Sequence, residues 1–405
     1  MNTHIVSLHV QEMGLFSRLD ISFSPGVNII IGPNGCGKTS ILKLICYCLS
    51  VEDLKFIRIR KNAEFWIDAV MQQRKIRCGA AGIVETDQEY RQLSVKMWGN
   101  IPTDDVDDRY APTKTIPYNL LAIGANRPVE YEHIGGMKKE SKGVERQNLY
   151  RKTNIKSLEN AKLPSVKQWM INRYFIIEKD WAEIKKNNWE KIMSILPKSS
   201  PYQAQLKFER IESDLEPIFS VNDKLCYFEE LASGFKSFLS IIFSIADWCE
   251  GVNDGESGLL ENAEGTVLID EIDAHLHPEW QAKIIKTLTT IFPKLQFILT
   301  SHSPHIIASA EKYQVIAIPE HDGIVTLEPK DNDFRGWQLD FILEDLMGFS
   351  NEDELSADEV LVNIDKAYES GDIDSFDREL SKLSEILHRN DPVLKVYKIK
   401  RSNLL

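Results

Sequence analysis

One short segment constrains the fold of this chain more than any other feature of its sequence. Residues 32–39 read Gly-Pro-Asn-Gly-Cys-Gly-Lys-Thr, directly after an apolar run at 27–31 and before a helical pattern at 39–49. This order matches the phosphate-binding pattern G-x-x-x-x-G-K-[ST] between a strand and a helix. The apolar run is typical of a central strand buried on both faces, so we expect an α/β fold around a sheet.

Each residue type in this segment suits one part of a bound phosphate chain. Glycines allow a loop whose backbone N–H groups point at phosphate oxygens, and the following helix adds its positive dipole end. Lys38 is expected to reach the β- and γ-phosphates, and the Thr39 hydroxyl to serve Mg²⁺. The alternative is an ordinary glycine-rich turn between a strand and a helix. The candidate nucleotide-binding residues of the loop are Gly32, Pro33, Asn34, Gly35, Cys36, Gly37, Lys38, Thr39 and Ser40.

A second apolar run, at 266–269, ends in two adjacent carboxylates, Asp270 and Glu271. Such pairs are common at surface turns, so the pattern carries little weight by itself. With the phosphate loop upstream, we expect Asp270 to hold Mg²⁺ through water. Glu271 is then the expected general base that activates the attacking water.

A third strand pattern, at 296–300, is followed by polar residues that include His302. Because ligands gather at the carboxyl ends of parallel strands, His302 is a candidate for contact with a γ-phosphate or with the attacking water. The alternative is a purely structural histidine. His275 and His277 follow Asp273 closely, but no third ligand stands at a useful spacing, which disfavours a metal pair.

Composition indicates a folded protein of ordinary globular type. A chain of 405 residues is long enough for two or three compact units. The net charge of −13 argues against coating of nucleic acid over the whole surface. Six cysteines form no Cys-x-x-Cys pair, and the first residues lack the apolar stretch of an export signal. We therefore expect a cytoplasmic protein, and one without a membrane segment because the apolar run at 238–248 is too short to span a bilayer.

Periodic patterns divide the chain into regions with different organisation. The four expected regions are an α/β half with the phosphate loop at 1–135, a helical insertion at 136–220, a second α/β half at 221–330 and a helical extension at 331–405. Strand patterns fall at 64–71, 92–98, 119–123, 266–270, 296–300, 314–318 and 323–327. A helical pattern between two of these strands predicts a parallel sheet, so the fold class is α/β with a mixed sheet.

The insertion begins with a strongly basic segment. Residues 138–156 contain seven basic and two acidic residues with few apolar ones, and we expect a mobile loop there. Such a segment could neutralise phosphates of DNA or RNA, and the alternative is a solvated loop in an acidic protein. Capping-box spacing at Ser165 predicts one long helix from there to near Pro197.

The order of four motifs resembles a known group of proteins. GPNGCGKT, LASGFKS, VLIDEIDAHLHPEWQ and ILTSHSP occur in the order found in ABC-type ATPases of the SMC, RecF and OLD group. The third and fourth motifs are more similar to stand-alone AAA-family ATPases of bacterial anti-phage operons, notably the ATPase subunit of Septu systems. The ATPase of PARIS systems is a nearby alternative. The resemblance covers residues 1–50 and about 225–310 well.

The resemblance implies an ATP and Mg²⁺ site that is completed in a head-to-tail homodimer or higher oligomer. Ser233 and Gly234 of one copy would face the γ-phosphate held by Lys38 of the other, with Asp273 along that interface. One departure is Ala232, which stands where the usual signature serine precedes the glycine-like position. Ser233 must then supply the hydroxyl, or hydrolysis is slow. Arg127 is a weaker candidate for the Q-loop region.

The resemblance also implies a partner. Septu ATPases are paired with an HNH-type nuclease, and the chain has no acidic nuclease constellation of its own after the second α/β half. The expected function is an ATPase that controls a separate nuclease effector in anti-phage defence. The alternative is a DNA-maintenance ATPase that clamps DNA without a toxic partner. A transporter cassette is disfavoured because roughly 190 residues separate the phosphate loop from the signature motif.

The last region carries amphipathic helical patterns after an apolar cluster at 337–346. Leu380, Leu383 and Leu387 lie on one such stripe, after a Gly371-Asp372 break that predicts a helical hairpin. The stripe serves either internal packing or docking of the effector subunit or of a second ATPase dimer.

Overall fold

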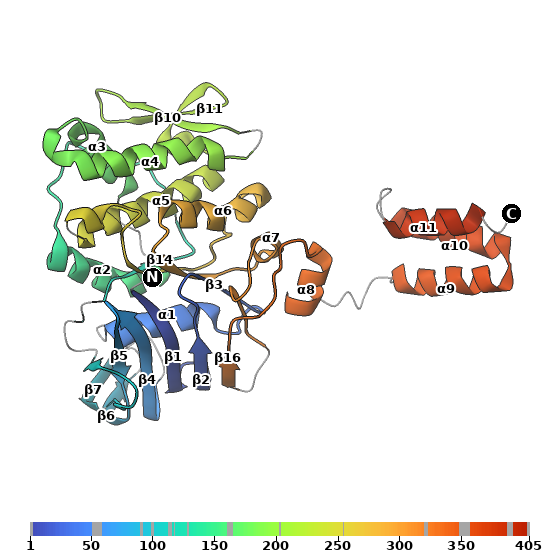
Figure 1. Ribbon diagram of the computed structural model, residues 1–405, viewed down its shortest axis with the longest axis horizontal. Helices are drawn as coiled ribbons and strands as arrows, with labels where there is room; N and C mark the ends of the chain where they lie inside the picture. The colour runs from blue at the N-terminus through green and yellow to red at the C-terminus, as the bar shows by residue number, and fades with distance from the viewer. Residues whose placement is uncertain are drawn as a thin grey trace. The chain divides into compact units, whose positions relative to one another are not determined.

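The computed structural model describes residues 3–50, 59–89, 92–98, 101–111, 116, 118–127, 129–159, 165–201, 204–253, 255–319, 323–347, 357–386 and 392–402. The chain divides into two compact units (Figure 1). We call Met1–Met347 the head unit and Gly348–Leu405 the terminal unit.

A parallel sheet forms the centre of the head unit. Its strands in spatial order are β15 (Val315–Ala317), β3 (Val27–Ile31), β14 (Leu295–Thr300), β13 (Gly265–Ile269) and β9 (Leu120–Ile123). Successive residues of β3 belong to different cores: Ile30 packs on one face of the sheet, while Ile29 and Ile31 pack on the other. The predicted central strand, buried on both faces, is therefore confirmed.

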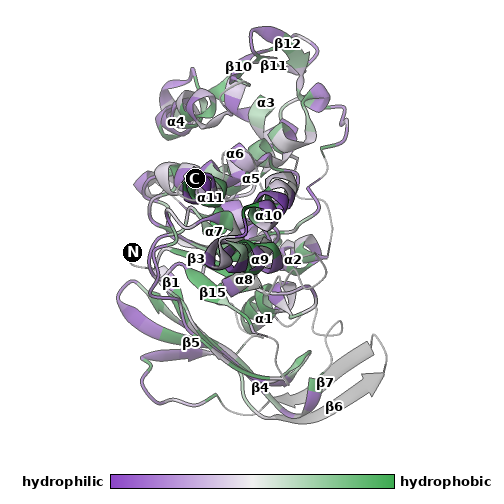
Figure 2. Cartoon of the chain, turned by 90° about the vertical axis from the view of Figure 1, so that its right-hand side faces the viewer, coloured by the Kyte–Doolittle hydropathy of each residue, from purple (hydrophilic) through white to green (hydrophobic). Residues whose placement is uncertain are grey.

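A second, mixed sheet covers one side of this layer. Its strands in order are β16 (Ile324–Leu327), β2 (Phe16–Ser22), β1 (Thr3–Met13), β4 (Ile59–Met71), β5 (Arg74–Ala80) and β8 (Asp108–Tyr110). Helix α1 (Lys38–Leu49) shares one apolar core with this sheet and with Ile30 of β3 (Figure 1). Both α1 and β15 are hydrophobic along much of their length (Figure 2). A separate hairpin joins β6 (Ile83–Glu89) to β7 (Gln92–Trp98).

Helices cover the other face of the parallel sheet. They are α2 (Gly143–Leu158), α3 (Val166–Ile176), α4 (Glu183–Ser199), α5 (Ser233–Val252) and α6 (Pro278–Ile291), with a small sheet of β10 (Leu206–Ile211), β11 (Pro217–Val221) and β12 (Lys224–Tyr227) beyond α3 and α4 (Figure 1). Helix α5 is apolar on most of its circumference and buries most of its residues, which is expected of a helix enclosed by others. The short helices α7 (Pro304–Ile307) and α8 (Leu339–Met347) complete the unit.

The insertion differs from the sequence expectation in three ways. The segment expected to be a mobile loop contains helix α2, because Tyr150, Ile155 and Leu158 bury against the head. The single long helix is broken: α3 ends at Ile176, and a short 3₁₀ turn precedes α4. The cap at Ser165 is confirmed, since its hydroxyl accepts a hydrogen bond from the Gln168 N–H at 3.1 Å. The small β10–β12 sheet was not predicted.

The terminal unit has a core of its own. It contains α9 (Ala357–Ser370), α10 (Ile373–Ile386) and α11 (Pro392–Ser402), packed around Ile364, Phe376, Leu383 and Leu394. Gly371 takes a φ of 67° at the α9–α10 turn, so the predicted hairpin break is confirmed, whereas α11 was not predicted. The unit begins after Met347 and not at 331, because Phe334 and Ile342 belong to the head core. None of the helices in the described ranges is long and apolar enough to cross a bilayer.

The stripe proposed for docking includes a residue that the terminal unit buries. Leu383 is fully buried in the unit's core, and Leu387 lies outside the described residues. Leu383→Asp is therefore expected to cost roughly 3 kcal/mol or more and to unfold the terminal unit, because it places an unpaired charge in a small core. Hydrogen exchange should show loss of protection in α9–α11 with protection of the head retained.

The matched control is Val362→Asp, also on α9–α11, where the side chain is 51% exposed. This variant should keep native protection. Equal protection in both variants would contradict the buried position of Leu383.

Candidate functional site

The phosphate loop leaves β3 and enters α1 as the sequence predicts. Gly37 has a φ of 100°, and a Cβ atom there would stand 2.7 Å from Cζ of Phe16. Only glycine therefore fits this position without strain. No side chain caps the first turn of α1, so its backbone N–H groups remain directed at the loop. Uncapped N–H groups at a helix N-terminus form a binding site for anions.

Lys38 turns back over the loop that precedes it. Its Nζ donates hydrogen bonds to the carbonyl oxygens of Gly32, at 2.9 Å, and Pro33, at 2.8 Å. Burial lowers the pKa of Lys38, and the nearby carboxylates of Asp270 and Glu271 oppose that shift. The ammonium group is thus held at the mouth of the loop with no carboxylate in direct contact among the described residues.

Asp270 lies against the first turn of α1. The Thr39 hydroxyl donates to its carboxylate oxygens at 3.0 and 2.9 Å, across 231 residues of sequence. Thr300, at the end of β14, donates its hydroxyl to Asp270 Oδ1 at 2.7 Å. The structure thus brings together the two predicted metal residues and adds Thr300, which the sequence analysis did not single out. Its position at the end of a buried strand was the available signal.

Glu271 is held in an uncommon backbone conformation. Its φ is 45°, a left-handed value that costs energy in a residue that, unlike glycine, carries a Cβ atom. Its N–H donates to the Thr300 hydroxyl at 2.7 Å, and its side chain is exposed. Thr300 therefore positions both acidic residues, and Glu271 presents its carboxylate to solvent at the edge of the sheet.

His302 follows β14 at the same edge. Its N–H donates to Asp273 Oδ1 at 3.3 Å. Burial, and then the charge of Lys38, lower the pKa of His302, so its imidazole is neutral at pH 7. Gln281 braces the segment after β13 by donating to the carbonyl of Leu276 at 2.8 Å, and it accepts from the Ser303 hydroxyl at 2.7 Å.

Arg127 has a role that its sequence position did not predict. Its guanidinium is buried and donates to the carbonyl oxygens of Gly124, Asp270, Glu271 and Ala274 at 2.8 to 3.3 Å. Its Nε donates to the hydroxyl of Ser237 on α5 at 3.1 Å. Burial lowers the pKa of Arg127 to about 10, which leaves it charged at neutral pH. Arg127 thus joins the acidic segment after β13 to α5.

Ser233 and Gly234 begin helix α5. A Cβ atom at Gly234 would stand 3.0 Å from both the His275 carbonyl oxygen and the Trp280 ring, so the glycine permits close packing. Ser233 is exposed. Within the described part of the chain, no recorded hydrogen bond joins Ser233 or Gly234 to residues 32–40.

One of the two histidines after Asp273 caps helix α6. His277 accepts a hydrogen bond from the Glu279 N–H and caps α6. Among the described residues, no cluster of three or more His, Cys, Asp or Glu side chains is arranged to hold a metal. The oxygen groups of Thr39 and Asp270 remain the donors at the phosphate loop, and such oxygen donors suit Mg²⁺.

Two family models match the chain. A model described as AAA domain matches residues 7–232, and a second AAA-domain model matches residues 195–308. The first covers more than half of the chain and includes the phosphate loop. The second includes the two acidic residues after β13 and His302.

Relatives from two named systems match most of the chain. The Septu protein PtuA of Bacillus thuringiensis is 27% identical over 98% of this chain and 97% of its own length. A retron Vc95 probable ATPase of Vibrio cholerae is 28% identical over 88% of this chain and 80% of its own. The Smc head domain of Pyrococcus furiosus, solved with the C-terminal domain of ScpA, aligns with a TM-score of 0.45 and 16% identity over 80% of this chain and 96% of that one. The resemblance to Septu proteins that the motifs indicate is confirmed.

Proposed function

The chain belongs to the AAA-domain family, and on that premise we propose that it binds ATP with Mg²⁺ and hydrolyses it to ADP and phosphate. The observation that carries the proposal is the contact of Thr39 with Asp270 beside the uncapped N-terminus of α1. This contact joins the phosphate loop to the strand end that bears the acidic pair. Both parts are needed for phosphoryl transfer.

Each residue of the site has a separate role in the proposed reaction. Backbone N–H groups of the loop and Lys38 bind the phosphates, and Thr39 and Asp270 would hold Mg²⁺, which neutralises phosphate charge when bound. Glu271 accepts a proton from the attacking water as the general base. Neutral His302 orients the water or the γ-phosphate through a hydrogen bond.

We also propose that two copies complete the site head to tail. Ser233 is exposed at the start of α5, and within the described residues no hydrogen bond links it to the phosphate loop of its own chain. In this arrangement Ser233 and Gly234 of one copy contact the γ-phosphate bound by the other. A single copy then holds half of a site, so hydrolysis is expected to be slow without a partner or trigger.

The relatives favour a role in anti-phage defence. Matches of nearly full length carry Septu and retron names, so we propose that this ATPase controls a separate nuclease effector, HNH-type if the system is Septu-like. The terminal unit remains the proposed docking region, through side chains other than Leu383. The DNA-clamping alternative predicts an active ATPase that purifies without a nuclease.

The decisive experiment compares wild type with Lys38→Ala, and with Lys43→Ala as a control on the same helix. Lys38→Ala should abolish Mg²⁺-dependent ATP hydrolysis and, in cells carrying the whole operon, restore phage plating. Lys43 should tolerate the change, because its Nζ pairs with the Glu159 carboxylate at 3.1 Å and does not contact the loop carbonyls that Lys38 binds. Equal hydrolysis by all three proteins would overturn the ATPase proposal, whereas hydrolysis without any effect on plating would overturn only the defence role.

A further inference from the structure

The head unit has an open groove at the start of the insertion, on a different part of the molecule from the nucleotide site. Its volume is about 740 Å³, and we call it the lysine groove. Its lining includes the cationic side chains of Lys138, Lys139, Lys142 and Lys185, the apolar side chains of Met137 and Trp181, and the carboxylates of Glu140 and Glu145. Trp181 is 72% exposed and Met137 is 54% exposed, so the groove combines cations with uncovered apolar surface.

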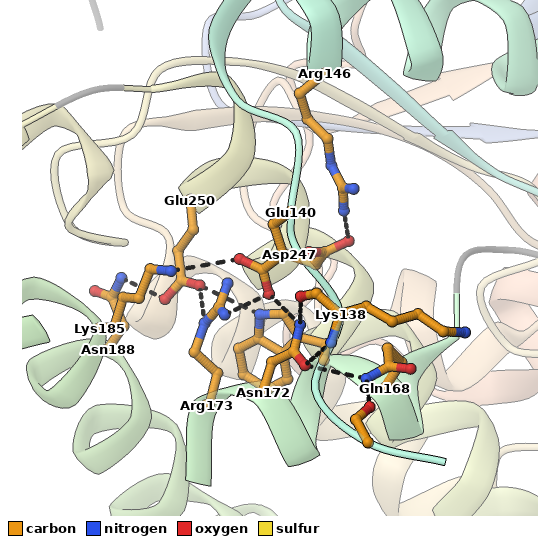
Figure 3. Close-up of polar contacts among 12 residues, drawn as sticks. Lys138, Glu140, Arg146, Gln168, Asn172, Arg173, Lys185, Asn188, Asp247 and Glu250 are labelled. Atoms are coloured by element: carbon orange, nitrogen blue, oxygen red, sulfur yellow. Dashed lines mark hydrogen bonds and ion pairs between the residues drawn. The ribbon is translucent and has the colours of Figure 1, made fainter. Parts of the chain in front are cut away.

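The segment that carries three of these lysines is fixed by helix α3. The Asn172 side-chain amide both accepts from the Lys138 N–H at 3.1 Å and donates to the Lys138 carbonyl at 3.0 Å. Gln168 donates to the Gly136 carbonyl at 3.0 Å. Figure 3 shows the Lys138 side chain extending away from these contacts with its amine free. The lysines therefore project from a held backbone, which lowers the entropic cost of binding a ligand.

One of the two acidic residues that line the groove is already engaged. Glu140 accepts from Arg173 at 2.7 Å and from Asn172 at 2.8 Å, and Lys185 lies 3.4 Å from its other oxygen (Figure 3). Arg173 and Lys185 are among the causes that lower the pKa of Glu140 to about 2, so it stays ionised and paired.

The remaining lysines are available to a ligand. Across the described ranges, no carboxylate lies within ion-pair distance of the amines of Lys138, Lys139 or Lys142. In a chain of net charge −13, this cluster is a local attractor for anions.

We propose that the lysine groove binds single-stranded nucleic acid, with backbone phosphates at the lysines and a base stacked on Trp181. Lysines along a groove track a phosphate backbone, and an exposed indole accepts an unpaired base whatever its sequence. In a duplex the bases are already stacked on one another, so no unpaired base is available to stack on the indole. The proposed binding does not depend on ATP hydrolysis. Its surface is formed by residues 138–142, which were expected to belong to a mobile loop and whose backbone helix α3 holds in place.

Only part of the basic segment serves this surface. Arg146 forms a buried ion pair with Asp247 of α5 and hydrogen-bonds Tyr150 at 3.2 Å. Lys152 and Lys156 are exposed on α2 but do not line the groove. These two lysines provide a control of the same residue type from the same segment.

The test measures binding of labelled oligothymidylate and oligouridylate of about 20 nucleotides to the full chain by fluorescence anisotropy. The groove variant is Lys138→Gln with Lys139→Gln and Lys142→Gln, and the control is Lys152→Gln with Lys156→Gln. We expect the groove variant to bind at least tenfold more weakly and to show a salt slope smaller by roughly 2, because each lost phosphate contact removes about 0.7 from the slope for a single strand. The control should bind as wild type does, and a duplex of equal length should bind more weakly than either single strand.

Substitutions of Trp181 test base stacking separately from surface charge, because they leave the charge of the groove unchanged. Trp181→Ala is expected to weaken binding roughly tenfold, and Trp181→Phe to restore most of it, because stacking needs an aromatic face. Its exposure means that neither change should alter the melting temperature. Equal loss in the groove and control variants, or unchanged binding by Trp181→Ala, would overturn the proposal. Preference for an acidic polypeptide such as polyglutamate over both single strands would assign the groove to a protein partner instead.

Discussion

Glu271→Gln is expected to slow ATP hydrolysis by roughly 10²- to 10⁴-fold while leaving ATP binding near that of wild type. The amide cannot accept the proton of the attacking water, but it has the same shape as the carboxylate. The backbone contact that places residue 271, from its N–H to the Thr300 hydroxyl at 2.7 Å, does not involve the side chain and should persist. The binding site therefore survives and the chemical step fails.

Phosphate release in a single turnover and binding of a fluorescent ATP analogue separate these two effects. Glu261→Gln is a suitable control, because this exposed residue pairs only loosely with Lys191, at 3.4 Å, away from the site. A wild-type rate for Glu271→Gln would assign the general base to another group. A loss of binding together with the rate would mean that the carboxylate is needed for Mg²⁺ or for the fold of the strand end.

The second large effect is on stability, and it concerns the charges buried between α3 and α5. Arg173 and Glu250 form an ion pair with side chains that are 1% and 2% exposed (Figure 3). Glu250 also accepts hydrogen bonds from Asn188 at 2.9 Å and from the Trp169 indole at 3.2 Å. Arg173→Met should lower the free energy of unfolding of the head unit by about 3–5 kcal/mol, because it leaves a carboxylate buried without its counter-charge.

The pH dependence of this loss identifies its cause. Burial raises the pKa of Glu250 and the charge of Arg173 opposes that shift, so loss of Arg173 raises the pKa of the folded carboxyl further. As pH rises above the pKa of the unfolded chain, near 4.3, the unfolded state ionises first and the folded state loses stability. The deficit of Arg173→Met should therefore be smaller at pH 5 than at pH 8 in urea unfolding.

Two further variants serve as controls for the effect of Arg173→Met on stability. Arg210→Met removes an exposed pair with Glu212 and should cost less than about 1 kcal/mol. Arg173→Met combined with Glu250→Leu replaces both charges by apolar groups and should recover much of the loss. A deficit for Arg173→Met that does not change with pH would indicate lost packing and not a stranded charge.

Local patterns in the sequence were sufficient to predict that the phosphate loop and the acidic pair after β13 lie at one edge of the sheet. The phosphate loop, Asp270, Glu271 and His302 each follow a strand that is buried along its whole length, and short motifs of this kind are encoded by neighbouring residues. Parallel pairing then brings the strand ends to one edge of the sheet. This is why residues more than two hundred positions apart could be expected in one site.

Contacts between residues that are distant in the sequence could not be predicted from local patterns. Arg127 bonds to carbonyl oxygens of a segment more than 140 residues later, and a carbonyl oxygen belongs to every residue type. The sequence predicts a loop in place of helix α2 because residues 138–156 include seven basic residues and few apolar ones. The helix is held by Tyr150 and by the pairing of Arg146 with Asp247, which lies about a hundred positions further along. Neither contact could be read from the basic segment itself.

The order of strands in the parallel sheet has a consequence for synthesis on the ribosome. Strand β3, which leads into the phosphate loop, pairs with β14 on one edge and with β15 on the other, and these begin at Leu295 and Val315. At roughly 5–20 residues per second, about 15–50 s pass before the nascent chain supplies the first of these neighbours. During that interval a mainly apolar strand with two unpaired edges is exposed to aggregation. A translation product that stops before residue 295 lacks both neighbours of β3, so it cannot assemble the nucleotide site and cannot compete with the complete protein for ATP.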